Sequence, residues 1–388
     1  MSTVNNGPQI VRSGLVLDLD ASYMRSYSPN VMPNPTDIFA WCGGAGLNSC
    51  TISRDTSMTR QYGSIPLKMT VTGNDAYIAS YTNSFWNLAP AANGQVWTVS
   101  VYAKASVATS GELFLFGADS SGNYGGAGTY GGSAAISITT SWTRVSASFT
   151  ISGVNVAYVQ VRLDGPNSGG SGQTIWWDGL QVERASTATR FNPYYFGNTT
   201  WRNSLGTGFN ATLVNAPVFT SSNLSFFTCD SSQNFTVSNP LNQSNLTQEW
   251  SVCAWVNIDT VTGAGARYLI SGLNNGVAVE WFDSGSLLYL NDGANDYYTY
   301  GNSIEGSGWI MLSFLFRNSG AYRKIFSNTT DITTSGPNNT STPSGQSGTF
   351  TIANNMRGKI SSLMIYNRLL STTEISANYE AMKTRFGL

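Results

Sequence analysis

Aromatic side chains in polar, glycine-rich segments are the residues of this chain best suited to chemistry, and that chemistry would be the binding of sugar rings. The C–H face of a pyranose packs on a flat aromatic ring, while amides and carboxylates bind its hydroxyls. We predict two groups of ligand contacts. They are Trp41, Trp86, Tyr124 and Tyr130 in the first half of the chain, and Asp292, Asp296, Tyr297, Tyr298 and Tyr300 in the second half.

Groups that could carry catalysis are scarce. The chain contains no histidine, which excludes Ser-His-Asp and Cys-His triads. Asp18 and Asp20 are two residues apart on a predicted strand, so their side chains share a face at about 7 Å, within rough reach of the carboxylate pair of a glycosidase. The simpler interpretation is that they end a strand and accept hydrogen bonds from loop N–H groups. We therefore predict no enzymatic activity.

The four cysteines show no metal-binding spacing. There is no C-x-x-C motif, and without histidine a zinc site is not expected. Synthesis in a cytosol favours free thiols, although Cys42 and Cys50 could close a small loop. Cys229 and Cys253 lie in two predicted strands and are candidate packed neighbours.

Strands with a two-residue period must position these side chains. In residues 14–20, Leu15, Leu17 and Leu19 are predicted to share one face. In residues 157–164 the period predicts one dry face and one face toward water. The dry face would carry Ala157, Val159, Val161 and Leu163, and the wet face Tyr158, Gln160, Arg162 and Asp164. Such strands, separated by glycine-rich loops, are typical of antiparallel sandwiches.

The end of the chain predicts its one convincing helix. Ser371 and Glu374 have the spacing of a capping box. Ile375, Tyr379 and Met382 then follow at i, i+4 and i+7, an apolar stripe that should lie on a sandwich.

The charge content excludes several classes of partner. Charged residues make up 11% of the chain and the net charge is −1, so no basic field exists to hold nucleic acid or anionic lipid. No run of about 18 apolar residues predicts a membrane span. The start of the chain lacks a signal peptide, so we expect synthesis in a cytoplasm.

Residues from Trp201 onward resemble a concanavalin A-like or laminin-G-like jelly roll. The resemblance rests on TTWRNSLGTGFNATLVNAPVF, EWSVCAWVNI and the ending GKISSLMIYNRLLSTTEISANYEAMKTRFGL. In phage structural proteins of this type, a segment like IVRSGLVLDLDASYMRSY stands directly before the W-x-x-L segment. Here a whole block of sequence separates the two, which suggests that residues 14–20 give a strand to the C-terminal sandwich around an insertion whose ends lie close together.

The middle block resembles a carbohydrate-binding module, another β-sandwich. Its ending TIWWDGLQVERASTATRFNPY is the diagnostic part. No cofactor is required, but both families often carry a structural calcium ion, and the resemblance implies Asp178 as a metal ligand. The expected fold is all-β, with two antiparallel β-sandwich (jelly-roll) domains, one inserted in the other, and one short C-terminal helix. Residues 1–30 supply the first strand of the C-terminal sandwich, 31–196 form the module-like sandwich, and 197–388 form the concanavalin A/laminin-G-like sandwich.

These resemblances imply a non-enzymatic surface protein of a phage virion, a head or tail fibre or a decoration, that binds host-surface glycans. Its partners would be other capsid or tail proteins, host polysaccharide and further copies of itself on the particle. Two alternatives stay open: a purely architectural decoration or cement protein without sugar binding, and, less favoured, a polysaccharide depolymerase.

Overall fold

A computed structural model describes residues 9–23, 27–32, 35–39, 46–58, 65–79, 88–123, 131–193, 199–220, 224–241, 249–260, 266–273, 277–282, 287–291, 304–317, 322–334 and 348–388. The chain divides into two compact units. Unit 1 comprises residues 1–27 and 199–388, and unit 2 comprises residues 28–198. All pairings between the described strands are antiparallel, and they build two sheets in each unit. The predicted all-β sandwich fold is confirmed.

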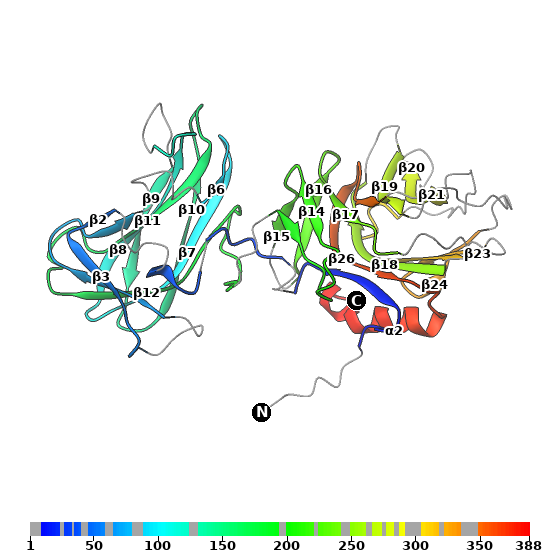
Figure 1. The fold of residues 1–388 in the computed structure, drawn as a ribbon, viewed down its shortest axis with the longest axis horizontal. Coiled ribbons are helices and arrows are strands. Elements are labelled where there is room, and N and C mark those ends of the chain that lie inside the picture. Colours follow the sequence, from blue (N-terminus) through cyan, green and yellow to red (C-terminus); the bar gives the residue numbers. More distant parts are fainter. Residues whose placement is uncertain are drawn as a thin grey trace. The chain divides into compact units, whose positions relative to one another are not determined.

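Unit 1 contains an eight-stranded sheet. Its strands run in the order β15 (Val218–Thr220), β16 (Phe226–Asp230), β26 (Arg357–Tyr366), β18 (Glu249–Ile258), β22 (Trp309–Arg317), β23 (Tyr322–Ser327) and β24 (Thr330–Asp331), and β1 (Leu15–Asp20) also pairs with β26. In Figure 1, β1 is the long blue strand of this unit.

A seven-stranded sheet forms the second layer of unit 1. Its order is β13 (Thr200–Trp201), β14 (Ala211–Val214), β17 (Asn234–Ser238), β25 (Thr349–Ile352), β19 (Ala266–Leu273), β20 (Val277–Phe282) and β21 (Leu287–Asn291). Large apolar side chains from both sheets, such as Trp201, Trp250 and Phe314, are fully buried in one core between them.

Strand β1 joins the start of the chain to its end. Leu19 lies opposite Leu363 and Asp18 opposite Met364 of β26. Leu17 and Leu19 are fully buried in the core between the two sheets. The prediction that Leu15 shares their face is wrong, because a β-bulge between Leu15 and Leu17 turns Leu15 to the opposite side of the sheet.

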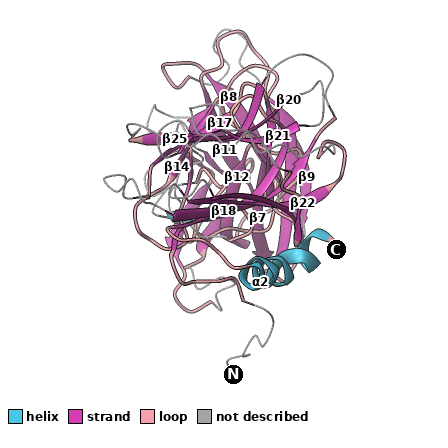
Figure 2. Ribbon diagram, turned by 90° about the vertical axis from the view of Figure 1, so that its right-hand side faces the viewer, coloured by secondary structure: helices cyan, strands magenta, loops and turns pink. Residues whose placement is uncertain are grey.

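Helix α2 (Thr372–Met382) and the 3₁₀ turn η3 (Lys383–Phe386) cover the outer face of the eight-stranded sheet (Figure 2). The predicted capping box of Ser371 and Glu374 is present. Ile375 is buried, and Tyr379 stacks on Trp255 with ring centroids 5.7 Å apart. The predicted stripe therefore faces the sandwich. Neither described helix has the length and apolar character to cross a membrane.

Unit 2 is a second sandwich. One sheet has five strands in the order β10 (Thr143–Thr150), β7 (Val96–Ala105), β12 (Thr174–Glu183), β4 (Leu67–Val71) and β3 (Cys50–Arg54). The six-stranded sheet has the order β2 (Leu47–Asn48), β5 (Tyr77–Ala79), β11 (Tyr158–Asp164), β8 (Thr109–Ala118) and β9 (Gly132–Ile138), with β6 (Ala89–Pro90) on β11. The two sheets enclose one apolar core.

The two ends of unit 2 meet at one buried side chain. The amide of Asn30 donates to the carbonyl oxygens of Leu180 (3.2 Å) and Asn192 (3.3 Å), and its oxygen accepts from the N–H of Val182 (3.1 Å). Nearby, the buried Glu183 carboxylate accepts from the N–H of Thr189 at 2.9 Å. These bonds hold the start and the end of the unit together.

The wet face predicted for β11 is partly wrong. Gln160 and Asp164 are 0% and 1% exposed. The Gln160 amide donates to the carbonyl oxygen of Gly122 at 2.9 Å, so the loop after β8 covers this part of the outer face. Asp164 is enclosed by the side chain of Arg162. The alternation of side chains predicted to which side of the sheet Gln160 and Asp164 point, but not the loop and the arginine that cover them.

The predicted packing of Cys229 against Cys253 is also wrong. Cys229 lies opposite Gly358 and Cys253 opposite Met364, six residues apart along β26. Cys229 is buried between the two sheets and Cys253 beneath the helix, on opposite faces. Together with Cys50, both are free thiols.

We expect Leu17→Ala to lower the free energy of unfolding of unit 1 by about 2–5 kcal/mol, since it removes buried methyl groups and leaves a cavity. Chemical denaturation followed by tryptophan fluorescence measures the change. Val218→Ala, at a position 44% exposed in β15 of the same unit, is the matched control and should shift stability by less than about 0.5 kcal/mol. Equal stability of the two variants would contradict the burial of β1.

Candidate functional site

The nine aromatic and acidic residues predicted to contact sugar all lie outside the described residues. They are Trp41, Trp86, Tyr124, Tyr130, Asp292, Asp296, Tyr297, Tyr298 and Tyr300. Strands that are next to these residues in sequence are described, however.

Three segments with predicted contacts attach to a single sheet of unit 2. Residues 40–45 precede β2, residues 80–87 connect β5 to β6, and residues 124–130 connect β8 to β9. All five strands belong to the six-stranded sheet. The segments that contain Trp41, Trp86, Tyr124 and Tyr130 are thus next in sequence to strands of this sheet.

The start of the glycine-rich loop after β8 is bound to the outer face of the same sheet. The Asp119 carboxylate accepts from the N–H groups of Ser121 and Asn123, both at 2.9 Å, which shapes a tight turn. Gly122 has a φ of 81°, in the left-handed region that glycine adopts without strain. Its carbonyl accepts the Gln160 amide, so the loop starts over β11.

Beside this loop start lies a stack of aromatic and charged side chains, which we call the Arg162 cluster: Tyr77, Asp75, Phe114, Arg162 and Asp164. The Arg162 guanidinium carbon lies 3.8 Å from the ring centroid of Tyr77 and 4.6 Å from that of Phe114. The guanidinium forms a forked pair with Asp164 and a 3.1 Å ion pair with Asp75. A guanidinium between two rings and two carboxylates is held rigidly.

Within the cluster, burial raises the pKa of Asp164 to about 7, although the Arg162 guanidinium acts in the opposite direction. The neighbouring carboxylates of Asp75 and Glu112 add to the rise. Removing a carboxylate from water disfavours its charged form. For Asp164 this effect on the pKa is larger than the opposite effect of the Arg162 guanidinium. Asp164 therefore titrates near neutral pH.

The Arg162 cluster was missed among the predicted site residues. Tyr77, Phe114 and Arg162 are all half-buried, and they offer flat aromatic surface next to polar groups on the outer face of the sheet. Phe114 lies opposite Arg162 in the register of β8 and β11. A signal existed in the strand GELFLFGA, where Phe114 and Phe116 alternate with core leucines, but only the register shows which residue faces them.

Asp178, the predicted metal ligand, lies on β12 and is 1% exposed, just before Gly179 at a bulge in the pairing with β7. Within the described part of the chain, no three His, Cys, Asp or Glu side chains gather as a metal site. Among the described residues, Asp178 thus does not belong to a group of three or more such side chains. Calcium binding at Asp178 stays a prediction.

Asp18 and Asp20, the carboxylate pair considered for hydrolysis, both point to the outer face of β1. Asp20 accepts from the N–H of Ser22 at 2.8 Å, the hydrogen bond expected at a strand end. It also forms a 2.9 Å ion pair with Arg385, while Asp18 lies 3.6 Å from the Arg12 guanidinium. Each carboxylate thus has its own arginine.

We expect the unfolding free energy of unit 2 to fall as the pH rises from about 4 to about 7. The folded pKa of Asp164 lies above its unfolded value, so its contribution is full at low pH and lost above about 7. In Asp164→Asn this pH dependence should shrink by on the order of 2 kcal/mol. Urea denaturation at pH 5 and pH 8 measures it; identical pH profiles of variant and parent would refute the assignment.

Comparison with known proteins finds one family model that is similar to part of unit 1. Residues 230–376 match the family model described as the concanavalin A-like lectin/glucanases superfamily, of the laminin G type. The match covers less than half of the chain, from the end of β16 into α2. A search of curated proteins found no match.

Solved structures resemble the chain only in part. They include botulinum neurotoxin type C, whose cell entry depends on interaction with two ganglioside molecules (14% identity, TM-score 0.36), and the binding domain of botulinum neurotoxin DC in complex with SialylT (16%, 0.37) or with rat synaptotagmin II (15%, 0.38). Each match covers 46% of this chain and 48% of the other, so this chain spans about half of their length. Similarity at this level says nothing about what the chain binds. The family match shows a similarity of residues 230–376 in unit 1 to the concanavalin A-like lectin/glucanases superfamily.

Proposed function

We propose that this protein is a non-enzymatic surface protein of a bacteriophage particle, and that unit 2 binds host-surface polysaccharide through its six-stranded sheet. One observation carries the binding proposal: the sheet whose outer face carries the Arg162 cluster also contains the strands that are next in sequence to Trp41, Trp86, Tyr124 and Tyr130.

The chemistry of this face suits a sugar chain. Half-buried Tyr77 and Phe114 offer ring surface to the C–H groups of a pyranose, and Arg162 between them keeps the rings in place. Asp75 and Glu112 supply carboxylate oxygens for hydroxyls at the same end of β11. Glycines around Tyr124 and Tyr130 permit exposure of these rings.

Binding without catalysis is supported by the side chains that acid–base chemistry would need. The chain has no histidine and no E-x-D-x-x-E strand of the kind that jelly-roll glucanases carry. Asp18 and Asp20 each lie beside an arginine, and Asp20 also accepts from the N–H of Ser22, so both carboxylates have structural partners at the strand end.

The particle assignment is supported by the opening segment IVRSGLVLDLDASYMRSY, which resembles phage structural proteins that share the jelly roll. On a particle the chain would contact other capsid or tail proteins and further copies of itself. Many copies of a weak sugar site on one particle would gain strength by avidity. Mass spectrometry of purified particles tests the location directly, and particles that lack the chain would end this part of the proposal.

We expect the purified full-length chain to bind bacterial surface polysaccharides on a glycan array, and Tyr124→Ala/Tyr130→Ala to weaken this binding by about tenfold or more, since two stacking rings are lost. Val107→Ala, an exposed position in the connection between β7 and β8 of the same unit, is the matched control and should bind as the parent does. Tight binding to phage shells with no glycan bound would instead favour the architectural alternative, and cleavage of a bound polysaccharide would favour the depolymerase.

A further inference from the structure

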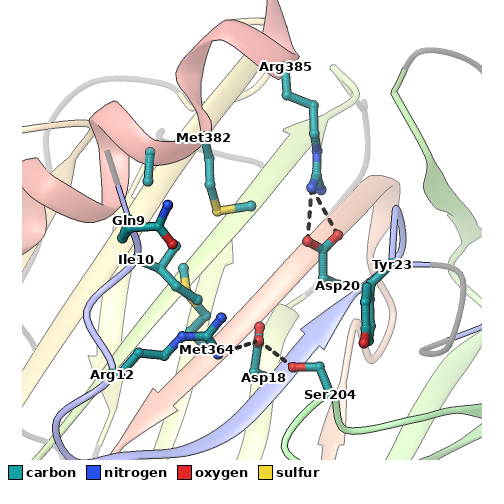
Figure 3. A pocket seen from close by; sticks show the side chains of 11 residues that line it. Gln9, Ile10, Arg12, Asp18, Asp20, Tyr23, Ser204, Met364, Met382 and Arg385 are labelled. Atoms are coloured by element: carbon teal, nitrogen blue, oxygen red, sulfur yellow. Dashed lines mark hydrogen bonds and ion pairs between the residues drawn. The ribbon is translucent and has the colours of Figure 1, made fainter. Parts of the chain in front are cut away.

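A cavity of about 390 Å³ opens on the outer face of unit 1, outside the core of that unit (Figure 3). Its walls come from five segments: the start of the chain, β1, the residues after β13, β26, and the end of α2 with η3. This volume lies in the range of about 300–1,000 Å³ that is typical of small-molecule sites. Every lining residue belongs to unit 1.

The deepest polar group of the cavity is the Asp18 carboxylate, whose side chain is 9% exposed. The Ser204 hydroxyl donates to its Oδ2, and the Arg12 guanidinium lies 3.6 Å from the same oxygen. Among the described contacts none falls on Oδ1, so a ligand hydroxyl can donate to it. Burial raises the pKa of Asp18, as expected for a carboxylate with few donors around it.

The backbone holds Asp18 and Ser204 in place before any ligand arrives. The N–H of Asp18 donates to Oδ1 of Asn203 at 3.0 Å, and the N–H of Ser204 donates to the carbonyl oxygen of Asp18 at 2.8 Å. The segment after β13 is thereby fixed against β1. A rigid acceptor loses little entropy on binding.

The opposite wall is equally fixed. Arg385 of η3 forms an ion pair with Asp20 and donates to the hydroxyl of Ser361 at 2.7 Å. In Figure 3 its guanidinium faces both carboxylate oxygens of Asp20. Because Asp20 and Arg385 already satisfy each other, neither offers a free charge to a ligand.

The start of the chain forms the third wall, and buried side chains hold it. The N–H of Val11 donates to Asn378 at 2.8 Å, and the hydroxyl of Tyr366 donates to the carbonyl oxygen of Val11 at 3.1 Å. This brings Ile10 and Arg12 to the cavity. The cavity therefore exists only because the first and the last residues of unit 1 meet.

Charge and polarity of the lining select a class of ligand. Two carboxylates face two guanidiniums, so the cavity has no net charge to attract an ion. Ile10, Met364 and Met382 give it an apolar side, and Tyr23, 43% exposed, stands beside the carboxylates at the rim. A ligand with one apolar face and several hydroxyls matches this lining.

We propose that this cavity is a second sugar site, which binds one neutral pyranose ring with a ring hydroxyl donating to Asp18 Oδ1 and a C–H face against Tyr23. The site is in a different unit from the polysaccharide-binding face proposed above and does not depend on it. A divalent cation is disfavoured because the described residues of the cavity offer only two carboxylates, each beside an arginine.

Saturation-transfer NMR with the full-length chain tests the proposal. The probes are methyl glucoside, methyl mannoside, methyl galactoside and N-acetylglucosamine, with glucuronic acid as the charged comparison. At least one neutral sugar should bind the parent in the millimolar range. Asp18→Asn and Tyr23→Ala should each weaken that binding by about tenfold, and glucuronic acid should bind more weakly than the neutral sugar.

Matched variants separate the two sugar sites. Glu380→Gln, on the exposed side of α2 outside the cavity, should bind as the parent does. Tyr124→Ala/Tyr130→Ala in unit 2 should also keep the Asp18-dependent signal. Circular dichroism checks the fold of Asp18→Asn. If Asp18→Asn is unfolded, Tyr23→Ala, at an exposed position, tests the cavity independently.

Three results would overturn the cavity proposal: no neutral sugar bound by the parent, equal binding by the parent and both cavity variants, or preferred binding of glucuronic acid. If sugar binding is lost in the unit 2 variant alone, the proposed function stands and the cavity proposal fails. If it is lost in the cavity variants and kept in the unit 2 variant, the cavity proposal stands, and the glycan array with Tyr124→Ala/Tyr130→Ala decides separately on the binding face of unit 2.

Discussion

The pairing of β1 with β26 is the constraint on which the rest of this molecule depends. Residues 15–20 lie on β26 some 350 positions later in the chain, and Leu17 and Leu19 complete the core between the two sheets of unit 1. Without β1, the second half of β26 would expose one edge, and part of that core would face water. Unit 1 is therefore complete only when both ends of the chain are together.

The same strand also builds the outer surface of unit 1. Since side chains alternate across a strand, the burial of Leu17 and Leu19 turns Asp18 and Asp20 outward. Met382 and Arg385, near the end of the chain, line the same cavity as these two carboxylates. The cavity is thus a consequence of closing the sandwich rather than a separate feature. Asn30 lets this closure tolerate an insertion, because it holds the two ends of unit 2 together at the point where the chain leaves unit 1.

The two sheets of unit 2 have different characters. The five-stranded sheet joins the ends of the unit through β12, whereas the six-stranded sheet carries the Arg162 cluster on its outer face. In a chain with only 11% charged residues, Asp75, Glu112, Arg162 and Asp164 lie close together at this face. The ion pairs of Arg162 with Asp75 and Asp164 offset the cost of removing these charges from water.

The sequence by itself determined to which side of a strand most side chains point, the capping box at Ser371 and the fold class. The reason is that a two-residue period and a local hydrogen bond involve only residues that are neighbours in the chain. The aromatic ligand contacts that the sequence predicts lie outside the described residues and stay a prediction. Tertiary structure alone decided that Leu15 leaves the face of Leu17, that Cys229 and Cys253 are separated, that Arg162 lies between Tyr77 and Phe114, and that Asp18 borders a cavity with Arg385. The physical reason is that alternation states which side of a strand a residue faces, whereas bulges, register and the cover above a face depend on segments hundreds of residues away.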